Sequence, residues 1–592
     1  MSALLEIKDL NVHFALADGD VHAVKEASLS IQEGECLGVV GESGSGKSQL
    51  FLAAFGLLAS NGRAGGSVKY RGEEILGAPA KRLNALRGGA VTMIFQDPLT
   101  SLTPHMKIGA QIVEALMLHR RVPRPAAEQR AREMLDYVRI PESARRLKQY
   151  PHELSGGMRQ RVMIAMATIT GPDLIIADEP TTALDVTVQA QILEILRALK
   201  TDKKTAIAMV SHDMGVIAGL ADRVQVMRYG EILESGSADE IFYTPRHDYT
   251  RMLLDAIPKA GEKPAPATAV GAPLLTVDDL KVSFPVKDAD FLRGLFGKTQ
   301  LLRAVDGISF TLHQGETLGV VGESGCGKST LARAVLQLLP KTAGRVVWLG
   351  RDLDATTQSD IRKLREDFQI VFQDPLASLD PRMPIGLSIA EPLKSLEPQL
   401  SREALRQKVR AMMQRVGLEP GWINRYPHEL SGGQNQRVGL ARAMIVGPKM
   451  LVCDEAVSAL DVSIQAQIVD LIRDLQAETR LALIFISHDL SVVRRLSHRV
   501  MVLYLGRVVE LAPSGALYAD PRHPYTRALL SAVLSPDPRA ERVRKRELLT
   551  GDLPSPLDPR AQLTFLKSRL DQPGYRPRLE QVATDHWVAE HD

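Results

Sequence analysis

Cysteine is scarce in this chain of 592 residues: only Cys36, Cys326 and Cys453 occur, far apart in the sequence. Their spacing excludes a disulfide framework and any metal site built from several cysteines, and it fits a reducing cytosol. An excess of charge of one sign is also lacking, because 73 basic and 70 acidic residues leave a formal net charge of +3. A global attraction to nucleic acid or acidic lipid is therefore not expected.

Long apolar runs are missing as well. The most apolar stretch, residues 161–178, is interrupted at 171–173 by glycine, proline and aspartate. A spanning helix needs about 20 consecutive apolar residues. Charged side chains also stand among residues 6–9, where a secretory signal would need an apolar stretch. We expect neither a membrane span within this chain nor an export signal.

The chain contains an internal repeat. GESGSGKS at 41–48 recurs as GESGCGKS at 322–329, and YPHELSGG at 150–157 recurs unchanged at 426–433. Further pairs keep the same order: FQDPLTSL with FQDPLASL, ADEPTTALDV with CDEAVSALDV, SHDM with SHDL, and PRHDYTRMLL with PRHPYTRALL. Because the chain is also too long for one hydrophobic core, we interpret it as two copies of one domain.

The repeat and the composition predict the domain boundaries. A stretch rich in proline, alanine and glycine separates the copies and is typical of a linker. A flexible linker of this length spans roughly 20 Å. The predicted parts are a first domain at 1–258, a linker at 259–273, a second domain at 274–540 and a C-terminal tail at 541–592.

Apolar periodicity predicts the fold class. Runs such as ECLGVV and DLIIAD are typical of buried parallel strands, and they alternate with longer segments of helical period. Residues 96–150 have helical patterns without strand patterns. Each copy is therefore predicted to be an α/β domain with a mainly parallel sheet and a helical subdomain.

The repeated glycine-rich segment follows an apolar strand and has the pattern Gly-x4-Gly-Lys-Ser. It is typical of a phosphate-binding loop, because glycines let backbone N–H groups close around phosphate oxygens. The lysine would reach the β and γ phosphates, and the serine hydroxyl would bind Mg²⁺. A chance glycine-rich turn is the alternative, but two copies in the same context argue against it. The predicted nucleotide-binding residues are Gly41, Ser43, Gly44, Gly46, Lys47, Ser48, Gln49, Gly322, Ser324, Gly325, Gly327, Lys328, Ser329 and Thr330.

An acidic pair ends a second apolar strand in each copy. Asp178 and Asp454 are suited to bind the metal, and Glu179 and Glu455 to activate the attacking water. A lone Asp-Glu pair is usually a solvated loop. Its recurrence at similar spacing from a phosphate loop favours the catalytic interpretation.

A histidine ends a third apolar strand in each copy. His212 and His488 stand at the same distance beyond the two glutamates and could contact the γ phosphate. For a single histidine a structural role would be the better interpretation. The paired placement favours a functional role.

These motifs together resemble the nucleotide-binding subunits of ATP-binding cassette (ABC) transporters, with two cassettes fused in one chain. LSGGM and LSGGQ resemble the signature of that family, and "ALD" ending at Asp185 and at Asp461 resembles its D-loop. Gln96 and Gln373 resemble its Q-loop glutamines, which the resemblance implies act in catalysis and at the metal. Phe14 and Phe284 stand where the family stacks an aromatic ring on adenine, although a core aromatic is nearly as good an interpretation.

The resemblance also explains why the signature is repeated. In the family two cassettes pack head to tail, and the signature of one closes over the ATP held by the other. It implies that Ser431, Gly432 and Gly433 complete the site of Lys47, and that Ser155, Gly156 and Gly157 complete the site of Lys328. Both sites keep the residues needed for hydrolysis. Mild departures, Met158 in the first signature and Ala456 and Val457 beside Glu455, leave open whether the two sites turn over equally.

The C-terminal part indicates which transporters the chain resembles. Residues 521–538 and 548–556 resemble the tail of ATPases from bacterial dipeptide, oligopeptide, glutathione and nickel importers. Many relatives carry a cysteine cluster after this tail, whereas no cysteine follows Pro556, so we expect no iron–sulfur cluster. Residues 97–106 and 374–383 resemble the surface that receives a permease's coupling helix.

The resemblance implies ATP and Mg²⁺ as cofactors and peptide import as the function. It also implies two integral-membrane permease subunits as partners, an indirect periplasmic or extracellular binding protein, no nucleic acid, and a peripheral position on the cytoplasmic face of the inner membrane. Export of a peptide or drug is one alternative. A soluble tandem ATPase acting on ribosomes or DNA is another, although the long charged linker and the zinc-binding cysteines of those relatives are lacking.

Overall fold

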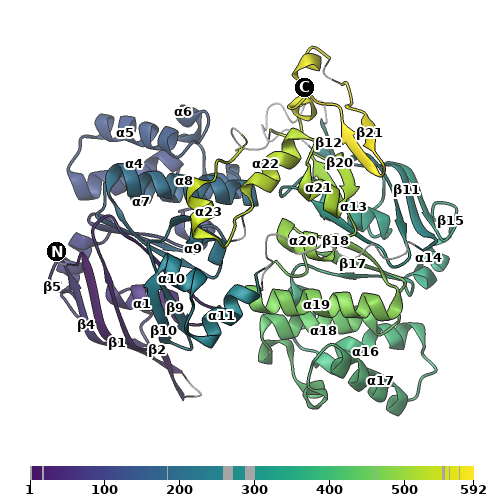
Figure 1. Ribbon diagram of the computed structural model, residues 1–592, viewed down its shortest axis with the longest axis horizontal. Helices are drawn as coiled ribbons and strands as arrows, with labels where there is room; N and C mark the ends of the chain where they lie inside the picture. The colour runs from purple at the N-terminus through teal and green to yellow at the C-terminus, as the bar shows by residue number, and fades with distance from the viewer. Residues whose placement is uncertain are drawn as a thin grey trace. The chain divides into compact units, whose positions relative to one another are not determined.

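The computed structural model describes residues 3–16, 19–182, 184–257, 271–286, 300–458, 460–547, 549, 554–558, 560–572 and 574–592. The chain forms two compact units, shown in Figure 1. The first unit is Met1–Ile257 with Leu534–Gly551, and the second is Pro258–Val533 with Asp552–Asp592. Residues 259–270 of the predicted linker lie outside the described residues, and Pro273 already begins a strand.

Two sheets form the core of the first unit. An antiparallel sheet has the order β2-β1-β4-β5, with β1 Leu5–Leu16, β2 Gly19–Ile31, β4 Gly62–Tyr70 and β5 Glu73–Glu74. The main sheet has the order β10-β9-β3-β8-β7-β6, with β3 Cys36–Val40, β6 Val91–Ile94, β7 Leu174–Asp178, β8 Ala206–Ser211, β9 Arg223–Arg228 and β10 Glu231–Ser237. All neighbours in the main sheet are parallel except β10 on β9. The central strands β3, β7 and β8 are buried throughout, as their apolar runs predict.

Helices cover this sheet and form a helical subdomain between β6 and β7. The subdomain contains α3 Pro98–Ser101, α4 Ile108–Arg120, α5 Arg124–Tyr137, α6 Ser143–Arg146, η1 Pro151–Glu153 and α7 Gly156–Thr168. The other helices are α1 Lys47–Ala54, α2 Ala80–Leu86, α8 Val186–Lys203, α9 Met214–Leu220, α10 Ala238–Tyr243 and α11 Asp248–Asp255. Helix α7 belongs to the same apolar cluster as β7 and α8, which joins the subdomain to the sheet.

The second unit repeats this architecture. Its antiparallel sheet has the order β12-β11-β14-β15, with β11 Pro273–Val286, β12 Gln300–His313, β14 Ala343–Trp348 and β15 Arg351–Asp352. Its main sheet has the order β16-β17-β18-β13-β19-β20-β22-β21, with β13 Thr317–Val321, β16 Phe368–Val371, β17 Met450–Asp454, β18 Ala482–Ile486, β19 Arg499–Tyr504, β20 Arg507–Pro513, β21 Leu579–Ala583 and β22 His586–Ala589. The predicted α/β class, with a mainly parallel sheet and a helical subdomain in each copy, is confirmed.

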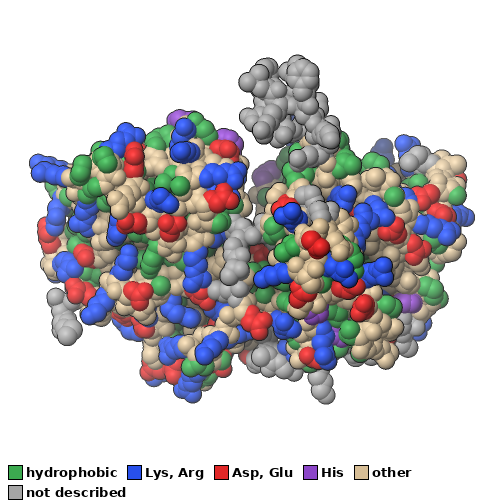
Figure 2. Space-filling model, turned by 90° about the horizontal axis from the view of Figure 1, so that it is seen from above, with side chains coloured by type: hydrophobic (Ala, Val, Ile, Leu, Met, Phe, Trp, Pro, Cys, Tyr) green, Lys and Arg blue, Asp and Glu red, His purple; other side chains and the backbone are tan. Residues whose placement is uncertain are grey.

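The helices of the second unit follow the same order. They are α13 Lys328–Val335, α14 Gln358–Leu364, α15 Pro375–Ser378, α16 Ile385–Leu396, α17 Arg402–Arg415, η2 Pro420–Asn424, η3 Pro427–Glu429, α18 Gly432–Met444, α19 Val462–Thr479, α20 Leu490–Leu496, α21 Ser514–Ala519, α22 Pro524–Ala532, η4 Ala561–Leu563 and η5 Lys567–Arg569. Among the residues that the structure describes, no helix combines the length and the apolar character of a membrane span. Acidic and basic side chains are interspersed on the face shown in Figure 2.

The residues after 533 divide between the units differently from the predicted boundaries at 540 and 541. The tail contributes β21 and β22 to the main sheet of the second unit, where β22 pairs antiparallel with β20. Residues 534–551, which we call the returning segment, belong to the first unit instead. Their helix α23 Pro538–Val543 lies beside α9 and α10 (Figure 1).

Specific contacts hold the returning segment on the first unit. Leu534 packs on the first core, where a Cβ added to Gly215 of α9 would lie 2.9 Å from the Leu534 Cβ. The Arg539 guanidinium pairs with Asp239 at 3.0 Å and lies over the ring of Tyr243. These groups lie far apart in the sequence, which is why the repeat alone did not predict this placement.

Candidate functional site

The predicted site residues follow the carboxyl ends of neighbouring parallel strands. The glycine-rich loop follows β3, His212 follows β8, Asp178 ends β7, and Gln96 comes shortly after β6. The strand order β3-β8-β7-β6 puts all four ends on one edge of the sheet, which is where open α/β sheets bind ligands. The second unit has the same arrangement in β13, β18, β17 and β16.

Glycine is sterically required in the loop. Gly41 and Gly46 have φ of +157° and +97°, and an added Cβ would lie 2.2 Å from the Met227 oxygen and 2.4 Å from the Ala23 oxygen, respectively. At Gly44, with φ of +77°, an added Cβ would meet no atom within 4 Å, so this part of the loop faces open space. The loop is therefore tightly packed at Gly41 and Gly46 and accessible at Gly44, as a phosphate-binding loop requires.

The loop lysine is nearly buried and folded over the loop. The Lys47 ammonium donates to the carbonyl oxygens of Gly41 and Glu42, both at 2.8 Å. In the second unit Lys328 donates to the corresponding carbonyls of Gly322 and Glu323, at 2.7 and 3.1 Å. The cation is thus held at the loop in both units.

A serine hydroxyl and a carboxylate meet beside each loop. Ser48 donates to the Asp178 carboxylate at 2.8 Å, and Ser329 donates to Asp454 at 2.8 Å. Burial raises the pKa of both aspartates above the usual range, while the serine bonds act against that rise. A hydroxyl and a carboxylate at this point are oxygen ligands of the kind that Mg²⁺ prefers. The residues present therefore fit a magnesium ion.

Glu179 is held by three neighbouring side chains. The Gln96 amide and the Thr182 hydroxyl donate to one carboxylate oxygen at 2.8 and 2.9 Å, and His212 Nδ1 lies 3.3 Å from the other. Burial acts to raise the pKa of Glu179, but His212, Thr182 and Lys47 outweigh it and the pKa is lowered. Glu179 has φ of 47°, a left-handed conformation that is uncommon for a residue with a side chain and recurs at functional sites.

Glu455 has a similar but less crowded setting. Gln373 donates to its carboxylate at 2.9 Å, His488 Nδ1 lies 3.8 Å away, and the Lys328 ammonium lies 4.0 Å away. The hydrogen bond from His488 lowers the pKa of Glu455 against the effect of burial. The backbone φ is 50°, so both glutamates share the left-handed conformation.

The signature serines begin helices in the helical subdomains. Ser155 caps α7 by accepting from the Met158 N–H, and Ser431 caps α18 by accepting from the Gln434 N–H. The second glycine of each signature packs tightly against the next long helix. An added Cβ would lie 2.6 Å from Val188 at Gly157 and 2.4 Å from Ile464 at Gly433. Bulkier residues would therefore displace α7 or α18.

Other predicted residues lie outside these clusters. Phe14 and Phe284 lie in β1 and β11 of the antiparallel sheets, the first half-buried on the core and the second 36% exposed. Asp185 and Asp461 stand at the N-caps of α8 and α19. Gln49 and Thr330 lie in the first turns of the helices that follow the loops.

Sequence reasoning missed Thr182 and two tyrosines. The Tyr249 hydroxyl accepts from the Glu42 N–H at 3.2 Å, and the Tyr525 hydroxyl accepts from the Glu323 N–H at 3.1 Å. The recurrence of Pro-Arg-His-x-Tyr in both copies was the available signal. The motif contributed to the resemblance to importer tails, but it did not indicate where the tyrosine hydroxyl lies.

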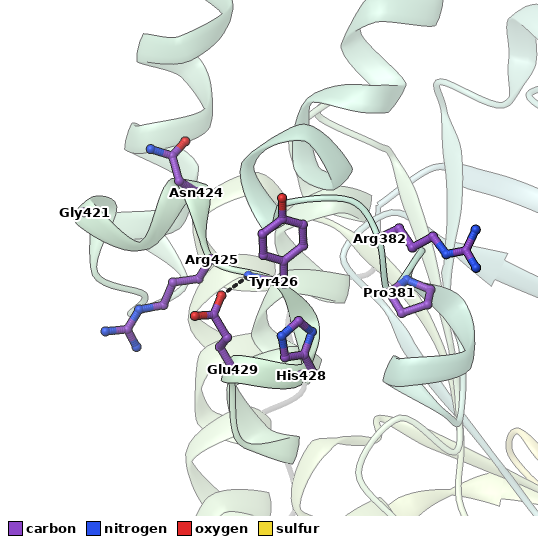
Figure 3. Close-up of a pocket in the computed structure, with 8 residues that line it drawn as sticks. All are labelled: Pro381, Arg382, Gly421, Asn424, Arg425, Tyr426, His428 and Glu429. Atoms are coloured by element: carbon purple, nitrogen blue, oxygen red, sulfur yellow. Dashed lines mark hydrogen bonds between the residues drawn. The ribbon is translucent and has the colours of Figure 1, made fainter. Parts of the chain in front are cut away.

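Two pockets lie near the predicted permease-contact segments. In the second unit, a pocket of about 660 Å³ lies immediately before the signature (Figure 3). It is lined by Pro381, Arg382, Gly421, Asn424, Arg425, Tyr426, His428 and Glu429. Arg425 and Arg382 extend on opposite sides of the Tyr426 ring (Figure 3). In the first unit, a mainly apolar pocket of about 300 Å³ includes Phe55, Phe95 and His119 in its lining.

Known proteins resemble this chain over nearly its whole length. The ABC transporter family model matches residues 24–182 and 305–458, and the model for the oligopeptide/dipeptide transporter C-terminal region matches 233–273 and 509–561. The chain is 44% identical to the glutathione import ATP-binding protein GsiA of Pectobacterium atrosepticum, over 99% of this chain and 97% of that protein. It is 45% identical to GsiA of Escherichia coli with the same coverage.

Among solved structures, ATP-binding cassettes match part of this chain. The dimeric post-hydrolysis state of the ATP-binding cassette MJ0796 bound to ADP and Pi is 26% identical, with a TM-score of 0.37, and covers 39% of this chain and 98% of that one. The predicted resemblance is confirmed by the family models and by the relatives of nearly full length. The chain belongs to the ABC transporter family, as an ATPase that carries two fused ATP-binding cassettes.

Proposed function

We propose that this ATPase drives the import of peptides, in the range of dipeptides, oligopeptides and glutathione-like cargo, through a separate membrane permease. The observation that carries the proposal is the identity of 44–45% with glutathione import ATP-binding proteins over 99% of the chain. The match to the oligopeptide/dipeptide transporter C-terminal region in both copies supports it. The domains act as a first cassette at 1–258 and a second at 274–540, joined by 259–273, with 541–592 as an extension, although residues 534–551 pack with the first unit.

The reaction is in-line attack of water on the γ phosphate of ATP. Glu179 and Glu455 orient that water and accept its proton, and their lowered pKa keeps them ionised at neutral pH. Gln96 and His212 fix the two oxygens of Glu179, so that the carboxylate presents a defined direction. At Glu455, Gln373 and His488 both approach the same carboxylate oxygen, and the Lys328 ammonium lies nearer the other.

The loops bind the phosphates of ATP. Lys47 and Lys328 leave the loop carbonyls for the β and γ phosphates, and the backbone N–H groups of the loops surround the phosphate oxygens. Mg²⁺ would be held by the Ser48–Asp178 and Ser329–Asp454 pairs together with Gln96 and Gln373, and would neutralise developing charge. Phe14 and Phe284 stack on adenine.

The signature of one cassette completes the ATP-binding site of the other. Ser431, Gly432 and Gly433 supply N–H donors at the start of α18 to the ATP on Lys47. Ser155, Gly156 and Gly157 at the start of α7 do so for the ATP on Lys328. ATP closes the pair and hydrolysis releases it.

The partners are two permease subunits, and a binding protein outside the membrane delivers the cargo to them. The pockets near residues 97–106 and 374–383 support this, because a helix end could insert into each. The linings differ: the first is mainly apolar, whereas the second carries Arg382 and Arg425. Two non-identical permease subunits would suit this difference. The chain would then lie on the cytoplasmic face of the inner membrane.

The test is purification of the tagged chain from mildly solubilised membranes, followed by mass spectrometry. Recovery of two related permease subunits, with ATPase activity of the complex stimulated by a peptide-loaded binding protein, is the expected result. An untagged strain and the Glu179→Gln, Glu455→Gln chain serve as controls for carry-over and for turnover. Recovery of ribosomal or DNA-repair proteins in place of permeases would overturn the import proposal and leave the ATPase assignment intact.

A further inference from the structure

A tyrosine hydroxyl of the C-terminal region reaches the phosphate loop in each unit. Tyr249, in the first turn of α11, accepts a hydrogen bond from the Glu42 N–H, and Tyr525, in the first turn of α22, accepts one from the Glu323 N–H. Both tyrosines are buried, with 3% and 0% of their surface exposed. The same contact thus occurs twice, between segments about 200 residues apart in each copy.

Each tyrosine is placed by a short chain of hydrogen bonds. In the first unit the Glu234 carboxylate of β10 accepts from the N–H groups of Arg246 and His247, at 2.7 and 3.1 Å. His247 Nδ1 then accepts from the Tyr249 N–H at 3.1 Å and caps α11. Each step fixes the next residue along the chain. This set of hydrogen bonds, which we call the anchor, therefore fixes the position of the tyrosine hydroxyl.

The second unit builds the same anchor. Glu510 of β20 accepts from the Arg522 and His523 N–H groups, both at 2.9 Å. His523 Nδ1 accepts from the Tyr525 N–H at 3.1 Å. The recurrence of the whole set explains why Pro-Arg-His-x-Tyr is repeated in the sequence.

The rings of the two tyrosines have different neighbours. The Arg228 guanidinium lies 4.5 Å from the centre of the Tyr249 ring. The Tyr504 ring lies 4.8 Å from that of Tyr525, with no arginine at the position that corresponds to Arg228. Ring packing therefore differs between the units while the hydroxyl contact stays the same. The shared feature is the hydrogen bond to the loop.

In each unit the tyrosine hydroxyl bonds to the same glutamate whose carbonyl oxygen accepts from the loop lysine. The Glu42 N–H is bound by Tyr249, and the Glu42 carbonyl oxygen accepts from the Lys47 ammonium. Glu323 is bound in the same way by Tyr525 and Lys328. When the lysine turns to ATP, the tyrosine bond remains to hold the first turn of the loop. A loop held in its binding conformation loses less entropy when it binds a ligand.

We propose that Tyr249 and Tyr525 are positioning residues that preorganise the two phosphate loops for ATP. Their hydroxyls bond to the loop backbone, so their effect falls on ATP binding more than on the chemical step. An interaction that stabilises the ground-state and transition-state complexes equally changes KM and leaves kcat unchanged. The C-terminal region thereby contributes to ATP affinity in each cassette.

The test compares hydroxyl deletions in the full chain without permease. Tyr249→Phe with Tyr525→Phe removes both loop bonds and keeps both rings. Tyr504→Phe is the matched control, because its hydroxyl bonds to Thr564 and its ring packs on Tyr525. For the double variant we expect KM and Kd for ATP to rise roughly three- to tenfold, with kcat within twofold, as for one net hydrogen bond. For the control we expect KM, Kd and kcat within twofold of the parent.

Amide hydrogen exchange of residues 41–48 and 322–329 gives a second measurement that does not depend on turnover. We expect faster exchange of these loops in the double variant without ATP, and parent-like exchange in the control. An unchanged ATP affinity in the double variant, with a melting temperature lowered as in Tyr504→Phe, would show a purely structural bond and overturn the proposal. Unchanged loop exchange would overturn it as well. Neither result depends on which cargo is imported.

Discussion

Glu179 and Glu455, which we propose as the catalytic glutamates, differ in what surrounds them, although the motifs around them are nearly the same. Glu179 receives hydrogen bonds from Gln96 and Thr182. At Glu455 the residue corresponding to Thr182 is Ser458, whose hydroxyl donates to the Glu455 backbone oxygen instead of the carboxylate. The histidine also lies farther away, 3.8 Å against 3.3 Å. The comparison shows that two copies with the same motifs can place different hydrogen-bond donors around the glutamate that we propose as the general base.

The helix starts of the two signatures differ as well. Ser431 and Gln434 form a reciprocal capping box, in which the Ser431 N–H donates to the Gln434 side chain at 2.9 Å. Met158 stands at the corresponding position of the first unit, and its side chain offers no such acceptor. Ser155 therefore accepts from the Met158 N–H without the reciprocal bond to a side chain at position 158. If signatures act across the pair, the better-capped signature serves the site of Lys47.

The largest effect is expected from changing both glutamates that we propose as general bases. Glu179→Gln with Glu455→Gln should lower phosphate release by roughly 10²- to 10⁴-fold while ATP still binds. The single variants then sharpen the comparison, because unequal residual rates would show unequal sites. Phosphate release and ATP binding are measured on the same preparation. Retention of most activity in the double variant would remove both glutamates from the mechanism.

Next in size is the loss of a buried ion pair in the returning segment. Arg546 pairs with the fully buried Glu541, and Arg544 contacts the same carboxylate at 3.1 Å. Arg546→Ala should destabilise the first unit by about 3 kcal/mol, because it leaves that buried charge only partly compensated. Thermal unfolding with limited proteolysis measures the change and locates it. The control is Arg522→Ala, whose exposed pair with Asp520 should contribute below about 1 kcal/mol.

His523 should make the stability of the second unit depend on pH. Burial, with smaller effects of His591 and Arg527, lowers the pKa of His523 to about 3. The folded pKa lies below the unfolded one, so this stability is present above pH about 6.5 and falls as the pH falls. At pH 5 the loss should be about 2 kcal/mol.

His523→Asn keeps a side-chain acceptor for the Tyr525 N–H and removes the titrating ring. Its unfolding, followed from pH 7 to pH 5, should lose less stability than that of the parent chain. An equal loss in parent and variant would mean that groups other than His523 carry the dependence.

The smallest effect concerns the capping box. Gln434→Met makes the second signature like the first, and should lower the stability of the second unit by roughly 0.5–1 kcal/mol. Differential scanning calorimetry measures it. The control is Gln414→Met, on α17 away from the signature, which should have little effect. A parent-like melting profile for Gln434→Met would mean that the capping difference does not distinguish the units.

Local patterns sufficed to predict the fold class and the candidate residues that the structure places at one edge of each main sheet. The loop glycines need left-handed or crowded backbone positions, and the strands β3, β7 and β8 are buried on both faces, so sequence and structure are linked within a few residues. The contacts that escaped prediction join distant residues: Tyr249 with Glu42, or Gln191 with the Leu549 carbonyl oxygen. A sequence pattern does not say which hydroxyl meets which N–H across a fold. Gly215, where the second copy has Ser491, is a local sign of the returning segment, because an added Cβ there would crowd Leu534.

The returning segment also determines when the first unit can finish folding during protein synthesis. The first unit includes residues 534–551, so the ribosome must produce nearly the whole chain before that unit has all its parts. Until then the surface of α9 and α10 that receives Leu534 and Arg539 is uncovered in the nascent chain. The usual sequence, in which an N-terminal domain finishes folding before the next is made, is therefore not open to this protein. A half-chain ending at residue 257 would carry that uncovered surface permanently.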